Sequence, residues 1–223
     1  MFEHVDIYCE RTAVGLFNEP LNAVTNLAFF IAAWLVLRRA RRRGRLDAAL
    51  AVLIGLVFAI GLGSLLWHTF AQRWAGAADV IPILLFIVTY VGLTMWRYFG
   101  ARGGEAIALA IAFLFFAPGL RSAATAALPP VLSPAFGYLP AFVALVVCGV
   151  LLALRRHPVA WWLLGAGTLF LVSLTFRGLD SHVCGDFAFG THFLWHILNA
   201  TVLGTLMIAY MRHGAQGPSQ AVT

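Results

Sequence analysis

The chain has 223 residues, of which 61% are hydrophobic and only 11% are charged. A mean hydropathy of +0.88 excludes an ordinary soluble domain and indicates a protein embedded in a membrane. The net charge of +6 comes from arginine, because the sequence contains no lysine. These arginines gather in the short loops between apolar segments, a distribution that argues against nucleic acid as a partner.

Seven apolar segments follow one another, each near the length of about 20 residues that crosses a bilayer. They span residues 20–38, 48–68, 79–96, 105–125, 131–154, 158–176 and 188–211. Pro118 interrupts the fourth segment, which has the weakest pattern of the seven. We therefore expect an all-α fold, a seven-transmembrane-helix bundle that forms a single domain over residues 1–223. The polar residues 1–19 have no signal-peptide pattern and are expected to form an amino-terminal segment on the outer side.

The arginines predict the orientation of the bundle. Eleven lie in one set of loops (Arg38, Arg39, Arg41, Arg42, Arg43, Arg45, Arg97, Arg102, Arg155, Arg156 and Arg212), and four lie in the other set (Arg11, Arg73, Arg121 and Arg177). By the positive-inside rule, the amino terminus is outside and the carboxyl terminus is cytoplasmic. The missing lysine and the many Ala, Gly and Arg residues are typical of a GC-rich bacterial genome. We thus expect a bacterial inner-membrane protein whose outer side faces the periplasm.

Three histidines are expected at the same depth in this bundle. His68 ends the second segment, and His192 and His196 begin the last one, four residues apart and so on one helix face. Ionisable groups inside a membrane are expensive and usually face a partner or a wet cavity. Three imidazoles that leave a fourth position open are typical of a catalytic zinc site. The alternative is a polar cluster that only forms hydrogen bonds within the bundle.

Two further residues are candidates for catalysis at this depth. Asp79 begins the third segment, and Ser64 lies one turn before His68. Asp79 is predicted to be a general base that takes a proton from water, and Ser64 a donor to the oxyanion that develops on a carbonyl. A simpler interpretation of Asp79 is a carboxylate that interacts favourably with the helix dipole.

The outer side also holds acidic residues and two cysteines. Carboxylates at Asp6, Glu10 and Glu19 are candidate ligands for a hard cation such as calcium. Cys9 and Cys184 are both expected in an oxidising compartment, where they can form a disulfide or remain two free thiols. Cys148 is expected to be a small core residue.

Several short motifs together resemble the alkaline ceramidase family, part of a wider group of seven-helix membrane hydrolases that includes adiponectin-receptor-like proteins. They are Gly61-x-Gly63-Ser64-x-x-x-His68, Asp79 eleven residues later, His192-x-x-x-His196, Cys9-Glu10 and Glu19-x-x-Asn22. The resemblance implies zinc held by His68, His192 and His196, with Asp79 and Ser64 completing the site. It also implies hydrolysis of the ceramide amide to a sphingoid base and a fatty acid, a calcium site near the amino terminus, and a disulfide there. Arg11 departs from the family's acidic run after the cysteine.

Other functions fit parts of this pattern. A retinal protein is excluded because no lysine is present for the Schiff base. An intramembrane serine protease would use Ser64 with one histidine, and a b-haem protein would use His68 with His192. A receptor or lipid-binding protein that keeps zinc without hydrolysis is the main alternative, although it needs neither Asp79 nor Ser64. The lipid substrate is expected to be ceramide or another N-acyl lipid.

Overall fold

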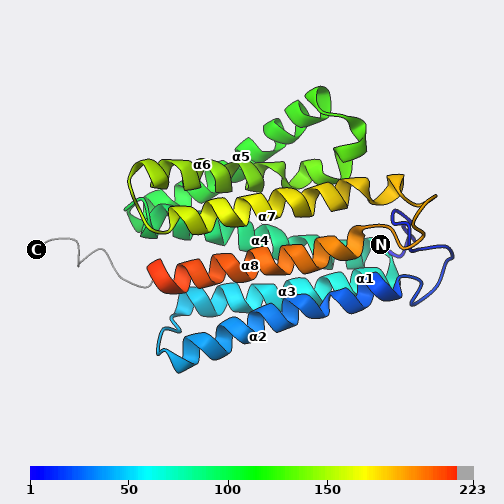
Figure 1. The fold of residues 1–223 in the computed structure, drawn as a ribbon, viewed down its shortest axis with the longest axis horizontal. Helices are drawn as coiled ribbons and strands as arrows, with labels where there is room; N and C mark the ends of the chain where they lie inside the picture. Colours follow the sequence, from blue (N-terminus) through cyan, green and yellow to red (C-terminus); the bar gives the residue numbers. More distant parts are fainter. Residues whose placement is uncertain (215–223) are drawn as a thin grey trace, which may run out of the picture.

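A computed structural model describes residues 1–214; residues 215–223, with the carboxyl terminus that the arginine pattern assigns to the cytoplasm, lie outside the described part. The described part is helical (Figure 1), which confirms the predicted all-α class. In chain order its elements are α1 (Pro20–Thr25), α2 (Leu27–Arg42), α3 (Ala48–Phe70), α4 (Arg73–Arg97), α5 (Gly103–Ala127), the 3-10 helix η1 (Pro130–Tyr138), α6 (Leu139–Leu154), α7 (Ala160–Leu179), the 3-10 helix η2 (Asp180–His182) and α8 (His192–His213).

Within residues 1–214, seven helical stretches are long and apolar enough to cross a membrane. Each helix packs against its neighbour in the chain from α2 to α8, and α8 returns to contact α2 and α3 as well as α7. Figure 1 shows α8 between α7 on one side and α2 and α3 on the other. This central place explains why α8 has buried residues along its whole length, including His192 and His196.

Local chemistry sets several helix ends. The Asp47 carboxylate accepts the Leu50 backbone N–H at 2.8 Å and so caps α3. At the other end of α3, Ala71 adopts a left-handed conformation with φ 48°, and its backbone N–H bonds the Trp67 carbonyl. Pro20 occupies the first turn of α1, where a backbone N–H has no acceptor within the helix and its absence therefore costs no hydrogen bond.

Several predicted boundaries were wrong. The helix expected at 79–96 begins at Arg73, so Asp79 lies in its second turn rather than at its start. The helix expected at 188–211 begins at His192, because residues before it form a loop. The span expected at 158–176 begins at Ala160 and runs three residues further, to Leu179, before η2.

Breaks within spans also differ from the expectation. The first predicted span contains two helices. The buried side-chain amide of Asn26 donates to the Asn22 carbonyl at 2.9 Å, so it competes with the backbone N–H that would bond this carbonyl in a continuous helix. The fifth begins as the 3-10 helix η1, which contains Pro130 and Pro134. The fourth is continuous through Pro118, although the end of α5 leans away from the bundle (Figure 1).

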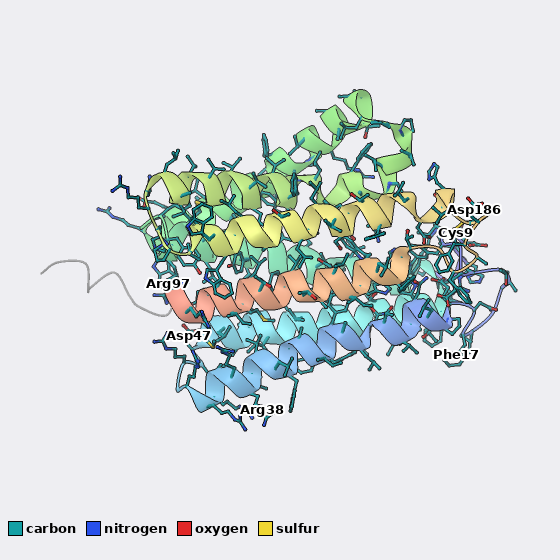
Figure 2. All side chains as sticks on the ribbon, viewed as in Figure 1. Cys9, Phe17, Arg38, Asp47, Arg97 and Asp186 are labelled. Atoms are coloured by element: carbon teal, nitrogen blue, oxygen red, sulfur yellow. A yellow bond between two sulfur atoms is a disulfide. The ribbon has the colours of Figure 1, made fainter. Side chains whose placement is uncertain are left out.

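The two ends of the bundle carry different side chains, as Figure 2 shows by placing Cys9 and Asp186 at one end and Arg38 and Arg97 at the other. We name them the histidine end and the arginine end, since the former holds His192 at the start of α8. Residues 1–19 lie at the histidine end. His4 pairs with Gln72, and the Val5 N–H donates to the Ala71 carbonyl at 2.8 Å.

A disulfide between Cys9 and Cys184 fastens the amino-terminal segment to the loop before α8, and it is the pair predicted from sequence. The two residues are 175 positions apart in the chain. Asp180 reinforces this link, since its carboxylate accepts the Cys9 backbone N–H at 3.2 Å. The start of α8 and residues near Cys9 are therefore held together by both a covalent and a polar contact.

Candidate metal centre

The three histidines expected to share a depth do come together. Their possible ligand atoms all lie within 4.8 Å of one another, and all three side chains are buried. The ring centroids of His192 and His196 are 4.7 Å apart, and those of His68 and His196 are also 4.7 Å apart. Because His192 and His196 are one turn apart on α8, the only long-range requirement is the contact of α3 with α8 that delivers His68.

Each imidazole keeps one buried nitrogen with no hydrogen-bond partner: Nε2 of His68, Nδ1 of His192 and Nε2 of His196. Buried polar atoms are rarely left unsatisfied, because the lost hydration is not recovered. Three such atoms in one cluster fit a cation that accepts their lone pairs. Neutral imidazoles in a set of three suit zinc.

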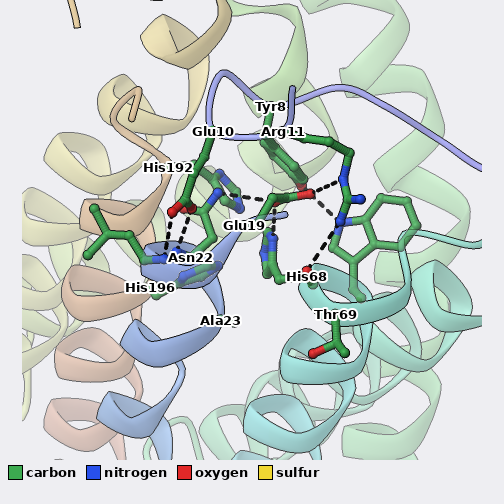
Figure 3. A network of polar contacts seen from close by, with 12 residues as sticks. Tyr8, Glu10, Arg11, Glu19, Asn22, Ala23, His68, Thr69, His192 and His196 are labelled. Atoms are coloured by element: carbon green, nitrogen blue, oxygen red, sulfur yellow. Dashed lines mark hydrogen bonds and ion pairs between the residues drawn. The ribbon is translucent and has the colours of Figure 1, made fainter. Parts of the chain in front are cut away.

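Glu19 and Arg11 hold His68 in place (Figure 3). Oε2 of Glu19 lies 2.5 Å from Nδ1 of His68, and Oε1 accepts from Nε of Arg11 at 2.6 Å. A carboxylate accepts rather than donates, so the hydrogen of His68 is on Nδ1 and the lone pair of Nε2 is free. Burial raises the pKa of the Glu19 carboxyl, while the Arg11 guanidinium and the Asn22 amide lower it. This carboxylate–histidine pairing is the usual outer contact of a metal-binding histidine.

His196 has an analogous partner in α1. The Thr25 hydroxyl lies 2.9 Å from Nδ1 of His196 and 2.8 Å from the Leu21 carbonyl. The hydroxyl donates to that carbonyl and accepts from Nδ1 of His196, which again leaves Nε2 as the free nitrogen. Glu19 and Thr25 thus lie on either side of the start of the first span, and each fixes one histidine.

His192 is fixed through its backbone and its ring. The Asp180 carboxylate accepts the backbone N–H groups of Thr191 at 2.7 Å and His192 at 2.8 Å, so a residue outside α8 satisfies the first donors of that helix. The Tyr8 ring stacks on the His192 ring, with centroids 4.0 Å apart and an interplanar angle of 28°. Tyr8 also lies 5.1 Å from the His68 ring, so it covers one side of the cluster.

Ser64 and Asp79 are brought together where α3 and α4 touch. Gly63 lies against the backbone of Ala78 and Asp79, so closely that a Cβ at Gly63 would be 2.6 Å from the Ala78 carbonyl carbon. The Ala78 carbonyl oxygen lacks its usual helix donor, because the residue four positions later is Pro82, which has no N–H. Ser64, which follows Gly63 in α3, is buried, and its hydroxyl lies within reach of the Asp79 carboxylate.

Asp79 is not a fourth member of the histidine cluster among the residues described. Its carboxylate is nevertheless close enough for its charge to act on Tyr8. Burial raises the pKa of the Tyr8 hydroxyl to about 12; the Arg177 guanidinium opposes this rise and the Asp79 carboxylate adds to it. Tyr8 therefore remains a neutral hydroxyl beside the rings of His192 and His68 at ordinary pH.

An apolar cavity lies between α4, α6, α7 and α8. Its lining includes Ile83, Tyr138 and Asn199 near the site and Thr94, Cys148 and Leu206 further along. Ile83 is one turn after Asp79, and Asn199 is three residues after His196, so each shares a helix face with a site residue. One end of the cavity is therefore about one helical turn from Asp79 and His196.

The three predicted calcium ligands do not come together as a side-chain cluster. The histidines are the one group of three or more histidine, cysteine or acidic side chains found together within residues 1–214, so Asp6, Glu10 and Glu19 do not converge. Asp6 is exposed. The Glu10 carboxylate accepts the N–H groups of Leu21 at 2.6 Å and Asn22 at 2.8 Å, and Glu19 is engaged by Arg11 and His68. Burial raises the pKa of the Glu10 carboxyl, and these two backbone donors oppose the rise.

Several residues that surround the site have no sequence pattern that predicts their role. Tyr8, Thr25, Arg177 and Asp180 were not predicted, and Glu19 was assigned to calcium rather than to His68. No local pattern identifies them, since each contacts a residue distant in the chain: Glu19 is 49 residues from His68, and Thr25 is 171 from His196. A lone carboxylate, Glu19, just before a span that begins with Pro20 was the strongest available signal.

Seven apolar helices around a buried three-histidine cluster define an integral membrane protein with a candidate metal centre. The chain belongs to the Ceramidase family, whose pattern it matches over residues 7–223. The match includes every residue of the centre described above. No curated protein sequence matches closely enough to add a nearer relative.

Proposed function

We propose that this protein is a zinc-dependent amide hydrolase that cleaves ceramide or a related N-acyl lipid into a sphingoid-type amine and a fatty acid. One observation carries the proposal: three buried imidazoles, each with a nitrogen that has no hydrogen-bond partner, come together at one end of a membrane bundle. Membership of the Ceramidase family supports the reaction and the lipid class. The nearby Asp79 and Ser64 supply the groups that hydrolysis needs.

His68, His192 and His196 would hold the zinc, and Glu19 and Thr25 would orient two of these ligands. Bound zinc supplies a Lewis acid that polarises a carbonyl and makes water more acidic. A site with three protein ligands leaves one position open to substrate or water, as catalytic zinc sites do. Structural zinc sites are closed by four protein ligands, so the three-histidine set favours the enzyme over a receptor that keeps zinc for stability.

Asp79 and Ser64 have separate tasks in this mechanism. Asp79 takes a proton from the attacking water as its oxygen bonds to the amide carbon. Ser64 donates a hydrogen bond to the carbonyl oxygen as negative charge develops there. When the carbon–nitrogen bond breaks, the proton held by Asp79 passes to the leaving nitrogen, which departs as an amine and leaves a carboxylic acid.

The apolar cavity supports a lipid substrate. It begins beside Ile83 and Asn199, one turn from Asp79 and His196, and is lined mainly by apolar side chains. An acyl chain in this cavity would place its amide at the polar cluster. The acyl chain would remain in an apolar environment before and after cleavage, so the reaction does not require its hydrocarbon to be exposed to water.

We further propose that the histidine end faces the periplasm of a bacterial inner membrane. The arginine-rich loops favour this orientation, and the Cys9–Cys184 disulfide fits an oxidising compartment. After reduction, an impermeant thiol reagent should label Cys9 and Cys184 on intact spheroplasts but not a cysteine that replaces Gly44. A Cys148→Ser background removes the remaining thiol. Labelling at position 44 alone would reverse the orientation.

The experiment that tests the enzyme combines metal analysis with hydrolysis. Purified protein should contain about one equivalent of zinc, and His192→Ala or His196→Ala should lose most of it. Ceramide and other N-acyl lipids should be cleaved in detergent and in bilayers, and a chelator should abolish cleavage until zinc is restored. Zinc-loaded protein that cleaves no amide-linked lipid would favour the receptor. Folded protein with less than roughly a tenth of an equivalent would reject the zinc site.

Asp79→Asn tests whether Asp79 is a general base or a zinc ligand. The amide keeps the size of the side chain but cannot accept the proton, so hydrolysis should fall by about 10²–10⁴-fold while zinc remains. Ser64→Ala removes one oxyanion donor and should cost on the order of 10²-fold. Loss of zinc from Asp79→Asn would instead make Asp79 a ligand, and the base would have to be another residue.

A further inference from the structure

The Ceramidase family resemblance implies calcium near the amino terminus, but the residues found there do not fit that cation. Calcium takes six to eight oxygen ligands in proteins. Both carboxylate oxygens of Glu10 already accept backbone N–H groups of Leu21 and Asn22. Glu10 therefore satisfies two donors at the start of α1, and each of its oxygens has one lone pair fewer for a cation.

Glu19 is equally occupied, and by a cation of the protein's own. Its Oε1 accepts from Nε of Arg11 at 2.6 Å, and its Oε2 accepts from His68 at 2.5 Å and from the Asn22 amide at 3.1 Å. Arg11 and Glu19 are 4% and 2% exposed, so this is a buried pair with no net charge. A divalent cation beside it would meet the Arg11 guanidinium without a free carboxylate to balance the added charge.

Arg11 makes two more contacts that tie separate segments together. One terminal nitrogen donates to the Gly15 carbonyl at 3.2 Å, and the other donates to the His68 carbonyl at 3.2 Å. A single guanidinium therefore contacts the amino-terminal segment, the carboxylate before α1, and the end of α3. Figure 3 shows it on the side of Glu19 opposite His192. Its planar fork of donors lets one side chain serve one carboxylate and two carbonyls at once.

We propose that Arg11 is the resident cation at this position, that the protein binds no calcium there, and that Arg11 positions His68 for metal binding through Glu19. Arg11 fixes the Glu19 carboxylate, which in turn fixes the His68 ring and the hydrogen on its Nδ1. The oxygens that surround Arg11 are a carboxylate and two carbonyls, the kinds of ligand that calcium uses. In this chain a covalently attached charge occupies that place. The inference rests on the proposed zinc site but not on the reaction.

Calcium itself provides the first test. Wild-type protein prepared without calcium should have the same melting temperature and zinc content after millimolar calcium is added, and equilibrium dialysis should find no bound calcium. A stoichiometric calcium ion, or a melting temperature that rises with calcium, would overturn the proposal. These readouts do not depend on hydrolysis, so protein that binds zinc but cleaves no lipid would reject the proposed function and leave this inference standing.

The second test concerns positioning. Arg11→Gln removes the charge that holds Glu19. Zinc affinity should fall by about 10–100-fold, as it does when other groups that orient a metal ligand are removed. Arg73→Gln is the matched control, because Arg73 lies at the same end in an exposed pair with Glu3 and should leave zinc affinity unchanged. Arg11→Lys keeps the charge but not the fork, and should be intermediate.

A double-mutant cycle separates positioning from general stability. If Arg11 acts on His68 through Glu19, Arg11→Gln should reduce zinc affinity little further once Glu19→Gln is present. Additive losses in the double variant would show that the two residues act independently and would refute the relay. Should Arg11→Gln fail to fold, Arg11→Lys in the same cycle and the calcium measurements on wild-type protein still decide the question.

Discussion

Gly63→Ala should disrupt the contact that brings Ser64 beside Asp79. The added Cβ would lie 2.6 Å from the carbonyl carbon of Ala78 and 3.0 Å from the backbone nitrogen of Asp79. Carbon atoms normally pack at about 3.5–4.0 Å, so α3 and α4 must separate by roughly 1 Å at this point. The obstacle is backbone rather than a flexible side chain, and no change of rotamer can relieve it.

The expected magnitude follows from that displacement. Overpacking of a close contact costs about 1–3 kcal/mol, which should lower the melting temperature. A misplacement of about 1 Å between reacting groups can cost on the order of 10²-fold in rate, so hydrolysis should fall more than stability alone predicts. Zinc should be largely retained, because Gly63 lies against α4, whereas the three histidines are on α3 and α8.

Gly55→Ala is the matched control within the same helix. Gly55 is exposed, and no heavy atom lies within 4 Å of a Cβ built there. Alanine favours a helix by up to about 1 kcal/mol over glycine, so this variant should be as stable as wild type or more so. Both variants should be compared by thermal melting, zinc content and lipid-amide hydrolysis. If Gly63→Ala retained wild-type stability and activity, the close approach would not matter to the site.

Three further predictions concern other parts of the chain. Thr25→Val removes the hydrogen-bond partner of His196 Nδ1 and should reduce zinc affinity about 10–100-fold. Thr69→Val is the control and should leave zinc affinity unchanged, because the Thr69 hydroxyl donates to the Leu65 carbonyl of its own helix. Replacing Cys9 and Cys184 with serine should lower the melting temperature and speed zinc loss, because the segment with Tyr8 and Arg11 is no longer fastened; reductant should do the same to wild type but not to this variant. Burial lowers the pKa of His157, and its Nδ1 accepts the Val159 N–H at 3.2 Å. The unfolded state therefore binds the proton more readily, and this contribution to stability is present above about pH 6.5 and lost as the pH falls. Melting temperature should accordingly drop less on acidification in His157→Asn than in wild type, and an equal drop in both would contradict the assignment.

The sequence alone was sufficient for the bundle and for its three histidines. Membrane spans are determined by local composition, because every backbone group must be satisfied within the helix and the side chains must tolerate lipid. Ionisable residues such as His68 and His192 are conspicuous in such segments, so their depth could be predicted before any packing was known. Helix ends were less certain, since the start of α4 at Arg73 depends on contacts with the amino-terminal segment rather than on apolar composition.

Tertiary structure decided what surrounds the histidines. Glu10, Glu19 and Asp6 are all acidic and near one another in sequence, which made a calcium site a reasonable expectation. Packing instead directs Glu10 to the start of α1 and Glu19 to Arg11 and His68, and leaves Asp6 exposed. Local sequence cannot distinguish these roles, because the partner that occupies each carboxylate is chosen by how the polar segment folds over the bundle. The energy of a buried charge depends on that partner far more than on its neighbours in the chain.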